Sequence, residues 1–217
     1  VALRQIPGVE VTFRAIAADR PSLAAIDAVL ADAGVASQVS VRDDGDASPI
    51  RLGDTLDIWG LFAHDLVILD ADDAPLRAFL TDLPAHTAPG VRILGTMGYV
   101  TAPMPAQELD IAMRFDAIIG SIQQARHLVD QQPTGTLASA AEAIAARMKG
   151  ANLRAVAIHD RQTLVIASQG EGPVAVAIPP DVAPATVVAA VAVTLARRAP
   201  WDAVGDFLAP EATGDAS

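Results

Sequence analysis

The sequence has 217 residues, of which 52% are hydrophobic and only 4% aromatic, so it supports a sizeable core of aliphatic side chains. A formal net charge of −11 argues against nucleic-acid binding, because phosphate backbones are bound by clustered Lys and Arg. The absence of cysteine excludes disulfides and thiolate chemistry. We expect a cytoplasmic protein without membrane contact, because the sequence shows neither an export signal nor an apolar run of about 20 residues.

The first half of the chain predicts alternating strands and helices. Residues 9–17 predict a strand, and Leu23, Ile26 and Leu30 repeat at the three- and four-residue spacing of a helix that ends at Gly34. The further elements expected in this half are a strand at 39–41, a helix at 52–63, a strand at 66–69, a helix at 76–83 and strands at 91–94 and 99–101.

The second half predicts a long helix and then a smaller unit. Apolar residues at helical spacing indicate one helix from about Ala106 to Asp130. The polar stretch 131–135 contains Pro and Gly and marks a domain boundary. We therefore predict a first domain at 1–130 and a small α/β output or dimerisation domain at 131–217. The elements expected in the second domain are a helix at 137–148, strands at 153–159, 164–168 and 174–178, and a helix at 185–198.

Three carboxylates follow the apolar run at 66–69. This run predicts a buried parallel strand, and Asp70, Asp72 and Asp73 come directly after it. Ligands of open α/β sheets bind at the carboxyl ends of the strands. These acids therefore mark the expected ligand-binding end of the sheet.

Four local features of residues 9–130 resemble the receiver domain of two-component response regulators. They are Ile16–Asp19 closing the first strand, Asp44-Gly45 after the second, Asp65–Asp70 with Pro75 nearby, and Gly98–Pro103 before the long helix. The resemblance implies an α/β fold with a flavodoxin-like parallel sheet. A fourth helix would be missing, because only Met97 separates Thr96 from Gly98.

The resemblance also implies functional residues and a metal ion. Asp70 matches the phosphoacceptor, and Thr96 matches the hydroxyl that senses the phosphoryl group. Asp19 and Asp70, with Asp72 as the neighbouring acid, would hold Mg²⁺, which binds oxygen ligands.

Two departures from the family pattern favour a degenerate receiver. Ala18 reduces the usual acid pair after the first strand to Asp19, and Ala102 occupies the place of the expected lysine. We therefore expect a signal-transduction protein, not an enzyme, that acts through protein contacts. The expected partners are a histidine kinase or a downstream signalling protein, with a homodimer as a further expectation.

Two alternatives stay open at this point. The first is an active response regulator that is phosphorylated on Asp70 with Mg²⁺. The second is a metal-dependent nucleotide-sugar transferase, because Asp70-Ala71-Asp72 also resembles the metal-binding Asp-X-Asp motif of those enzymes.

Overall fold

The computed structural model describes residues 7–17, 20–32, 34–41, 64–69, 91–97, 115–129, 135–147 and 153–209. The helices predicted at 52–63 and 76–83 and the strand predicted at 99–101 lie outside these ranges.

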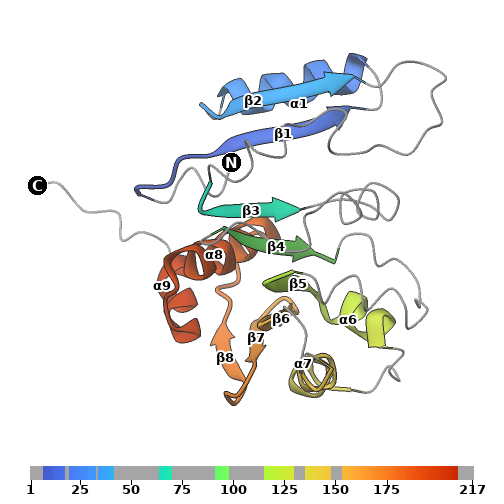
Figure 1. The fold of residues 1–217 in the computed structure, drawn as a ribbon, viewed down its shortest axis with the longest axis vertical. Helices are drawn as coiled ribbons and strands as arrows, with labels where there is room; N and C mark the ends of the chain where they lie inside the picture. Colours follow the sequence, from blue (N-terminus) through green and yellow to red (C-terminus); the bar gives the residue numbers. More distant parts are fainter. Residues whose placement is uncertain are drawn as a thin grey trace, which may run out of the picture.

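A six-stranded mixed sheet forms the centre of the molecule (Figure 1). Its strands, in spatial and chain order, are β3 (Leu66–Leu69), β4 (Arg92–Thr96), β5 (Ala117–Ser121), β6 (Ala155–His159), β7 (Thr163–Ser168) and β8 (Val174–Ala177). The first four strands are parallel, whereas β7 is antiparallel to both of its neighbours. The carboxyl ends of β3, β4, β5, β6 and β8 therefore lie at one edge of the sheet.

A separate pair of parallel strands lies on the β3 side of this sheet (Figure 1). Helix α1 (Arg20–Asp32) connects β1 (Thr12–Ala17) to β2 (Ala36–Val41). The prediction that this helix ends at Gly34 is confirmed, because Gly34 has a φ of 65° and its N–H donates to the carbonyl of Ala31. The N–H of Val35 donates to Leu30, and both side chains are buried, as in a Schellman cap.

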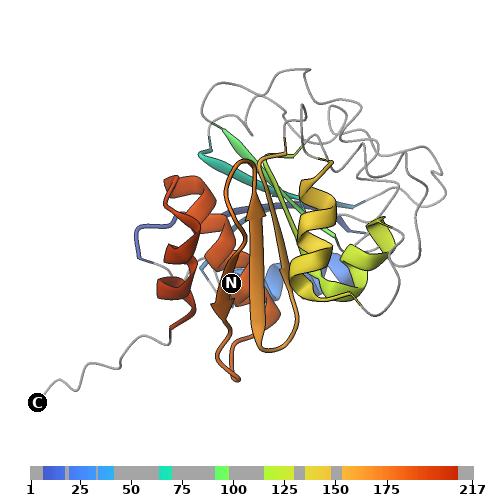
Figure 2. The ribbon, with the colours of Figure 1, turned by 90° about the horizontal axis from the view of Figure 1, so that it is seen from below.

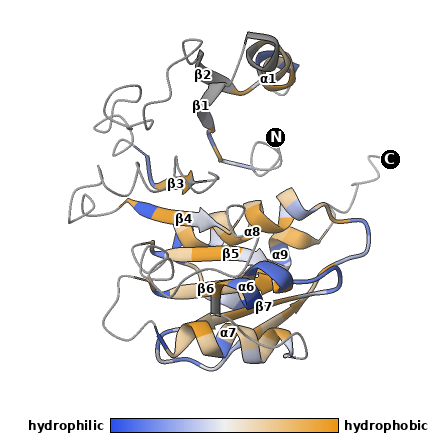
Figure 3. Cartoon of the chain, turned by 90° about the vertical axis from the view of Figure 1, so that its right-hand side faces the viewer, coloured by the Kyte–Doolittle hydropathy of each residue, from blue (hydrophilic) through white to orange (hydrophobic). Residues whose placement is uncertain are grey.

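Helices cover both faces of the six-stranded sheet (Figure 2). One face packs against α6 (Ile122–Val129) and α7 (Leu137–Ala145). The other packs against α8 (Pro184–Arg197), the 3-10 turn η2 (Trp201–Ala203) and α9 (Val204–Leu208). Strand β5 and helix α8 are mainly hydrophobic along their lengths (Figure 3), as expected of elements enclosed in a three-layer α/β structure.

The prediction of a single long helix from about Ala106 to Asp130 is wrong. Residues 117–121 form β5, and within the described part of this range, 115–129, only 122–129 are helical. Ala117, Ile118, Ile119 and Gly120 are all buried. A strand buried on both faces is a continuous apolar run, and over a few residues such a run also fits helical spacing.

The sheet continues across the predicted domain boundary at residue 130. Strand β5 precedes this boundary and β6 follows it, and the two pair in parallel from Ala117 with Ala155 to Ser121 with His159. The division into domains at 1–130 and 131–217 stays a prediction. Within the part of the chain that the structure describes, no helix is long and apolar enough to span a bilayer.

Candidate functional site

Three polar residues end neighbouring parallel strands at the carboxyl edge of the sheet. Thr96 ends β4, Ser121 ends β5 and His159 ends β6. Ser121 lies opposite His159 in the β5–β6 register, and Thr96 lies opposite Ile119. Since ligands of α/β sheets bind at this edge, these residues outline the candidate site.

Ser121 and Gln124 fix the start of α6 at this edge. The Ser121 N–H donates to Gln124 Oε1 at 2.8 Å, and the Gln124 N–H donates to Ser121 Oγ at 3.2 Å. This reciprocal arrangement is a capping box, which satisfies two N–H groups at the start of the helix. The Ser121 side chain is thereby held in place beside the end of β5.

The hairpin turn between β6 and β7 also lies at this edge. Asp160 Oδ1 accepts the N–H groups of Gln162 at 2.7 Å and of Thr163 at 2.8 Å. The N–H of Ile178 donates to the Gln162 carbonyl at 2.8 Å, which ties the turn to the segment after β8. The turn therefore has a fixed backbone and connects two strand ends of the site.

Helix α8 follows β8 after a short loop and begins without a polar cap. Its N-cap is Ala183, which makes no side-chain hydrogen bond, and Pro184 occupies the first turn. The N–H groups of Thr186 and Val187 both donate to the Ala183 carbonyl. Because proline has no N–H, few amides of this turn are available to a bound anion.

Most of the residues predicted from the sequence to form the site lie outside the described residues. These are Asp19, Asp70, Asp72 and Asp73, so their predicted convergence stays a prediction. Thr96 is described and lies partly buried at the end of β4. Among the residues that the structure describes, no three His, Asp or Glu side chains come together as a metal site.

Sequence reasoning missed Ser121 and His159 as neighbours in the site. The reason is that 117–121 was assigned to a helix, which removed the strand that ends at Ser121. One local signal pointed to the correct boundary: Ser121 followed by Gln124 is the Ser-x-x-Gln pattern of a helix start.

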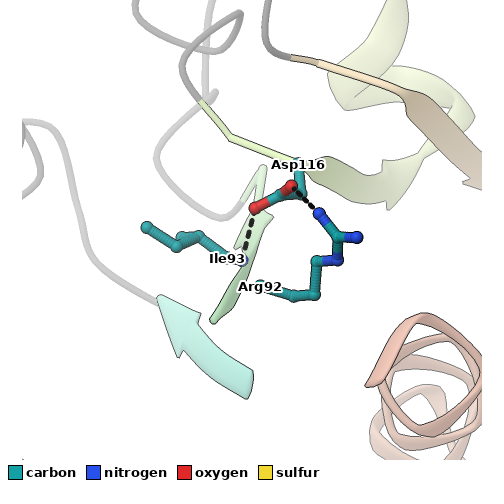
Figure 4. A network of polar contacts seen from close by, with 3 residues as sticks. All are labelled: Arg92, Ile93 and Asp116. Carbon is teal, nitrogen blue, oxygen red and sulfur yellow. Dashed lines mark hydrogen bonds and ion pairs between the residues drawn. The ribbon is translucent and has the colours of Figure 1, made fainter. Parts of the chain in front are cut away.

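Another hydrogen-bonded carboxylate, that of Asp116, lies at the opposite, amino edge (Figure 4). Asp116 Oδ1 accepts from Arg92 Nη1 at 3.0 Å, and Oδ2 accepts from the Ile93 N–H at 2.9 Å. Its backbone N–H donates to the Ile93 carbonyl, and its own carbonyl accepts from Arg154. Asp116 thus joins the beginnings of β4, β5 and β6, which is a structural role away from the candidate site.

Solved structures that resemble this chain include kinases. No family model and no curated protein sequence matches the chain. Phosphofructokinase-2 from Escherichia coli, solved with fructose-6-phosphate, has a TM-score of 0.66 and 14% identity, covering 95% of this chain and 76% of its own. A PfkB protein from Polaromonas sp. JS666 has a TM-score of 0.65 and 15% identity, with 95% and 80% covered.

A third similar structure is a pyrophosphate-dependent kinase in the ribokinase family, complexed with a pyrophosphate analog and myo-inositol. Its TM-score is 0.66 at 10% identity, covering 96% of this chain and 81% of its own. The Escherichia coli phosphofructokinase-2 has also been solved as a tetrameric inhibited form and in complex with potassium.

These similarities correct the receiver interpretation. The structural similarity to these kinases spans nearly the whole chain, whereas the resemblance to receiver domains rests on four short motifs in residues 9–130. The predictions of signalling through a receiver face, of a histidine-kinase partner and of a phosphoacceptor role for Asp70 are therefore wrong. The nucleotide-sugar transferase alternative is wrong for the same reason. The expectation that the chain is not an enzyme is also contradicted, because similar structures are those of enzymes. The chain has a ribokinase-like α/β fold and not the flavodoxin-like fold of a receiver domain.

Proposed function

We propose that this chain is a phosphotransferase that moves a phosphoryl group onto a hydroxyl of a sugar or polyol. The observation that carries the proposal is the fold likeness to a phosphofructokinase and to a pyrophosphate-dependent kinase, over 95% and 96% of the chain. Those two proteins were solved in complex with fructose-6-phosphate and with myo-inositol, which are both polyhydroxylated molecules.

The carboxyl edge of the sheet has the chemistry to position such an acceptor. Ser121 and His159 carry hydrogen-bonding side chains on neighbouring strands, and Thr96 ends the next strand. A polyol offers several hydroxyls that both donate and accept hydrogen bonds. Phosphoryl transfer depends mainly on positioning and on electrostatic stabilisation, so a fixed set of polar groups is what the reaction requires from the protein.

Asp70 and Asp72 are the proposed ligands of a divalent cation, with Asp19 as a third. Asp70 directly follows β3, whose carboxyl end belongs to the same edge. Carboxylate oxygens are ligands that Mg²⁺ prefers. A bound Mg²⁺ would neutralise charge on the phosphoryl donor, and these side chains would orient the donor toward the acceptor hydroxyl.

The experiment is a transfer assay on the full chain with Mg²⁺ and either ATP or pyrophosphate. Hexoses, hexose phosphates and inositols are offered as acceptors, and the phosphorylated product is identified by mass spectrometry. Asp70→Asn and Asp72→Asn are expected to lower the rate at least tenfold, since each removes a proposed metal ligand.

Asp206→Asn, at an exposed position in α9, is the matched control and should leave the rate unchanged. Absence of a phosphorylated product with every combination of donor and acceptor would count against the proposal.

We also propose that the protein is a homo-oligomer. The support is that the similar phosphofructokinase-2 has been solved as a tetramer. Light scattering after size-exclusion chromatography tests this, and a mass of 22.4 kDa at all concentrations would contradict it.

A further inference from the structure

Strand β8 is the last strand of the six-stranded sheet, and its outer edge pairs with no strand in the part of the chain that the structure describes (Figure 1). The side chains of Val174 and Val176 are half-buried, and Val176 packs against the hydrophobic core. Ala175 and Ala177 are exposed. The strand is therefore held in place by the core while its outer edge stays open.

The hydrogen bonds of β7 show which of its residues bond to each neighbouring strand. The Asp160 N–H donates to the Thr163 carbonyl at 3.0 Å, which is a bond to the β6 side. The Ile178 N–H donates to the Gln162 carbonyl at 2.8 Å, which is a bond to the β8 side. Because the backbone groups of successive residues point to opposite sides of a strand, the odd-numbered residues of β7 bond to β6 and the even-numbered ones to β8.

This alternation fixes the direction of the backbone groups in β8. Ala175 lies opposite Val165, and Ala177 lies opposite Thr163. Both partners are odd-numbered residues of β7 and bond to β6, so Ala175 and Ala177 do not bond to β7. Their N–H and C=O groups therefore point outward, at the same two positions where the side chains are small and exposed.

These outward groups are suited to pairing with one further strand. Two N–H donors and two C=O acceptors, spaced two residues apart, would form about four hydrogen bonds with an added strand. Soluble proteins often protect such an edge with a charged side chain, but β8 consists only of valine and alanine. Pro173 and Pro179 lie just outside the strand and limit the pairing to its own length.

The charge around β8 selects the kind of partner. The segments 163–184 and 199–209 contain β8 and the elements β7, η2 and α9, which contact it. They contain no Lys or Arg but four exposed acidic residues, which are Glu171, Asp181, Asp202 and Asp206. Arg161 and Arg198 border these segments, and the charge stays negative when both are counted. A second copy of the chain would bring the same acidic surroundings to this edge, whereas a basic segment would be attracted.

We propose that the outer edge of β8 binds an extended, basic peptide segment of another protein as an added strand. The backbone groups of Ala175 and Ala177 supply the hydrogen bonds, and the acidic residues around β8 supply the preference for Lys and Arg. This inference is independent of the proposed phosphotransferase function, because β8 binds its partner along the side of the sheet and not at the carboxyl edge.

The test is a titration of the full, ¹⁵N-labelled chain with a synthetic peptide in which lysine alternates with valine, followed by NMR. The amide resonances of Ala175 and Ala177 should move downfield, with a Kd below about 1 mM for a few backbone hydrogen bonds assisted by charge. Added salt should weaken the binding, because it screens the exposed charges. A peptide with glutamate in place of lysine is the matched control and should not bind.

Substitutions separate the backbone contribution from the charge contribution. Ala175→Pro removes an outward N–H that β7 does not use, and it should weaken binding about tenfold or more. Ala177→Lys keeps all backbone groups but adds a repelling cation, and it should weaken binding as well. The double variant Glu171→Gln with Asp181→Asn should weaken binding about two- to fivefold.

Glu142→Gln is the matched control for charge, because Glu142 is an exposed acid in α7, which packs against β6 and β7. It should leave the affinity for the peptide unchanged. Thermal unfolding of each variant verifies that the fold is retained.

Three results would overturn the proposal. The first is that the lysine peptide does not bind, or shifts resonances elsewhere than at β8. The second is that the glutamate peptide binds equally well, or that Ala175→Pro and Ala177→Lys both bind the lysine peptide like wild type. The third is that the amides of Ala175 and Ala177 become protected from hydrogen exchange as the protein concentration rises without peptide, since a second copy would then occupy the edge.

Discussion

Asp116 is the residue whose contacts best explain how the parallel strands start in register. Its carboxylate receives one bond from a side chain and one from a backbone N–H, and both Asp116 and Arg92 are largely shielded, with 15% and 19% of their side chains exposed. Removing a partly buried acceptor leaves its donors without a partner, which costs more than the bond itself contributes.

Asp116→Ala is therefore expected to lower the free energy of unfolding by about 1–3 kcal/mol. Urea unfolding monitored by circular dichroism measures it. Glu142→Ala, at an exposed position in α7, serves as control and should change stability by less than about 0.5 kcal/mol. Equal stability of Asp116→Ala and wild type would show that the network in Figure 4 contributes nothing.

Arg198 is the one non-glycine residue with positive φ among those described. It caps α8 in the left-handed region, with φ 54° and ψ 32°, and its side chain is exposed. A side chain in this conformation costs about 1–2 kcal/mol, whereas glycine adopts it freely.

We expect Arg198→Gly to stabilise the protein by up to about 1 kcal/mol, partly offset by the greater entropy of the unfolded chain. Arg198→Ala removes the same side chain but keeps the strain, so it should bring no gain. The midpoints of thermal unfolding compare the two, and a lower midpoint for glycine than for alanine would refute the strain argument.

At the scale of elements, two glycines show how closely β4 and β5 pack against their neighbours. A Cβ added at Gly95 would lie 2.8 Å from the ring of Phe115, which is completely buried. One added at Gly120 would lie 2.6 Å from the Met97 sulfur and 2.7 Å from the Met97 Cβ. A new rotamer can move the sulfur, but the position of the Cβ is fixed by the Met97 backbone.

Gly95→Ala and Gly120→Ala are thus each predicted to destabilise the protein by about 1–3 kcal/mol, because relief of either contact requires buried groups to shift. Urea unfolding of both variants measures the loss. A loss below about 0.5 kcal/mol for Gly120→Ala would mean that Met97 and β5 move apart at little cost.

Those elements with a clear local signal were predicted well from the sequence. The strand at 66–69 is confirmed as β3, and the helix predicted at 185–198 is confirmed as α8 with a shift of one residue at each end. Gly34 was correctly placed as a helix end, because a glycine after an apolar helical stripe supplies the positive φ that the cap requires.

Strand β5 was not predictable by spacing alone. Ile118 and Ile119 fit the apolar stripe of a helix. What distinguishes the strand is its position between β4 and β6, and this pairing involves residues distant in the sequence. Because of the same error, the pairing of Ser121 with His159 was not predicted. These residues are separated by 38 positions in the sequence but lie opposite each other in the sheet.

At the scale of the molecule, the receiver resemblance failed because its motifs describe features common to many α/β folds. Acids after parallel strands, and a glycine soon after a strand, are features of many α/β folds whose ligand site lies at the carboxyl edge. The two antiparallel strands β7 and β8 extend the sheet beyond β6, and this arrangement is fixed by long-range pairing. Local motifs therefore predicted a ligand site at the carboxyl edge, which stays a prediction, but did not identify the fold.

Stability and the candidate site are assigned to opposite edges of the sheet. Asp116 and Arg92 join strands at the amino edge, whereas Ser121 and His159 lie at the carboxyl edge. Substitutions at the amino edge should lower the free energy of unfolding, and substitutions at the carboxyl edge should lower the affinity for ligands.

The most direct test of the phosphotransferase proposal is ³¹P NMR of the full chain incubated with Mg²⁺, a phosphoryl donor and a polyol acceptor. The account predicts a new phosphate monoester resonance that grows as the donor signal falls and is absent when the acceptor is omitted. Donor signals that stay constant with every sugar and inositol offered, or that decline only to inorganic phosphate, would contradict it.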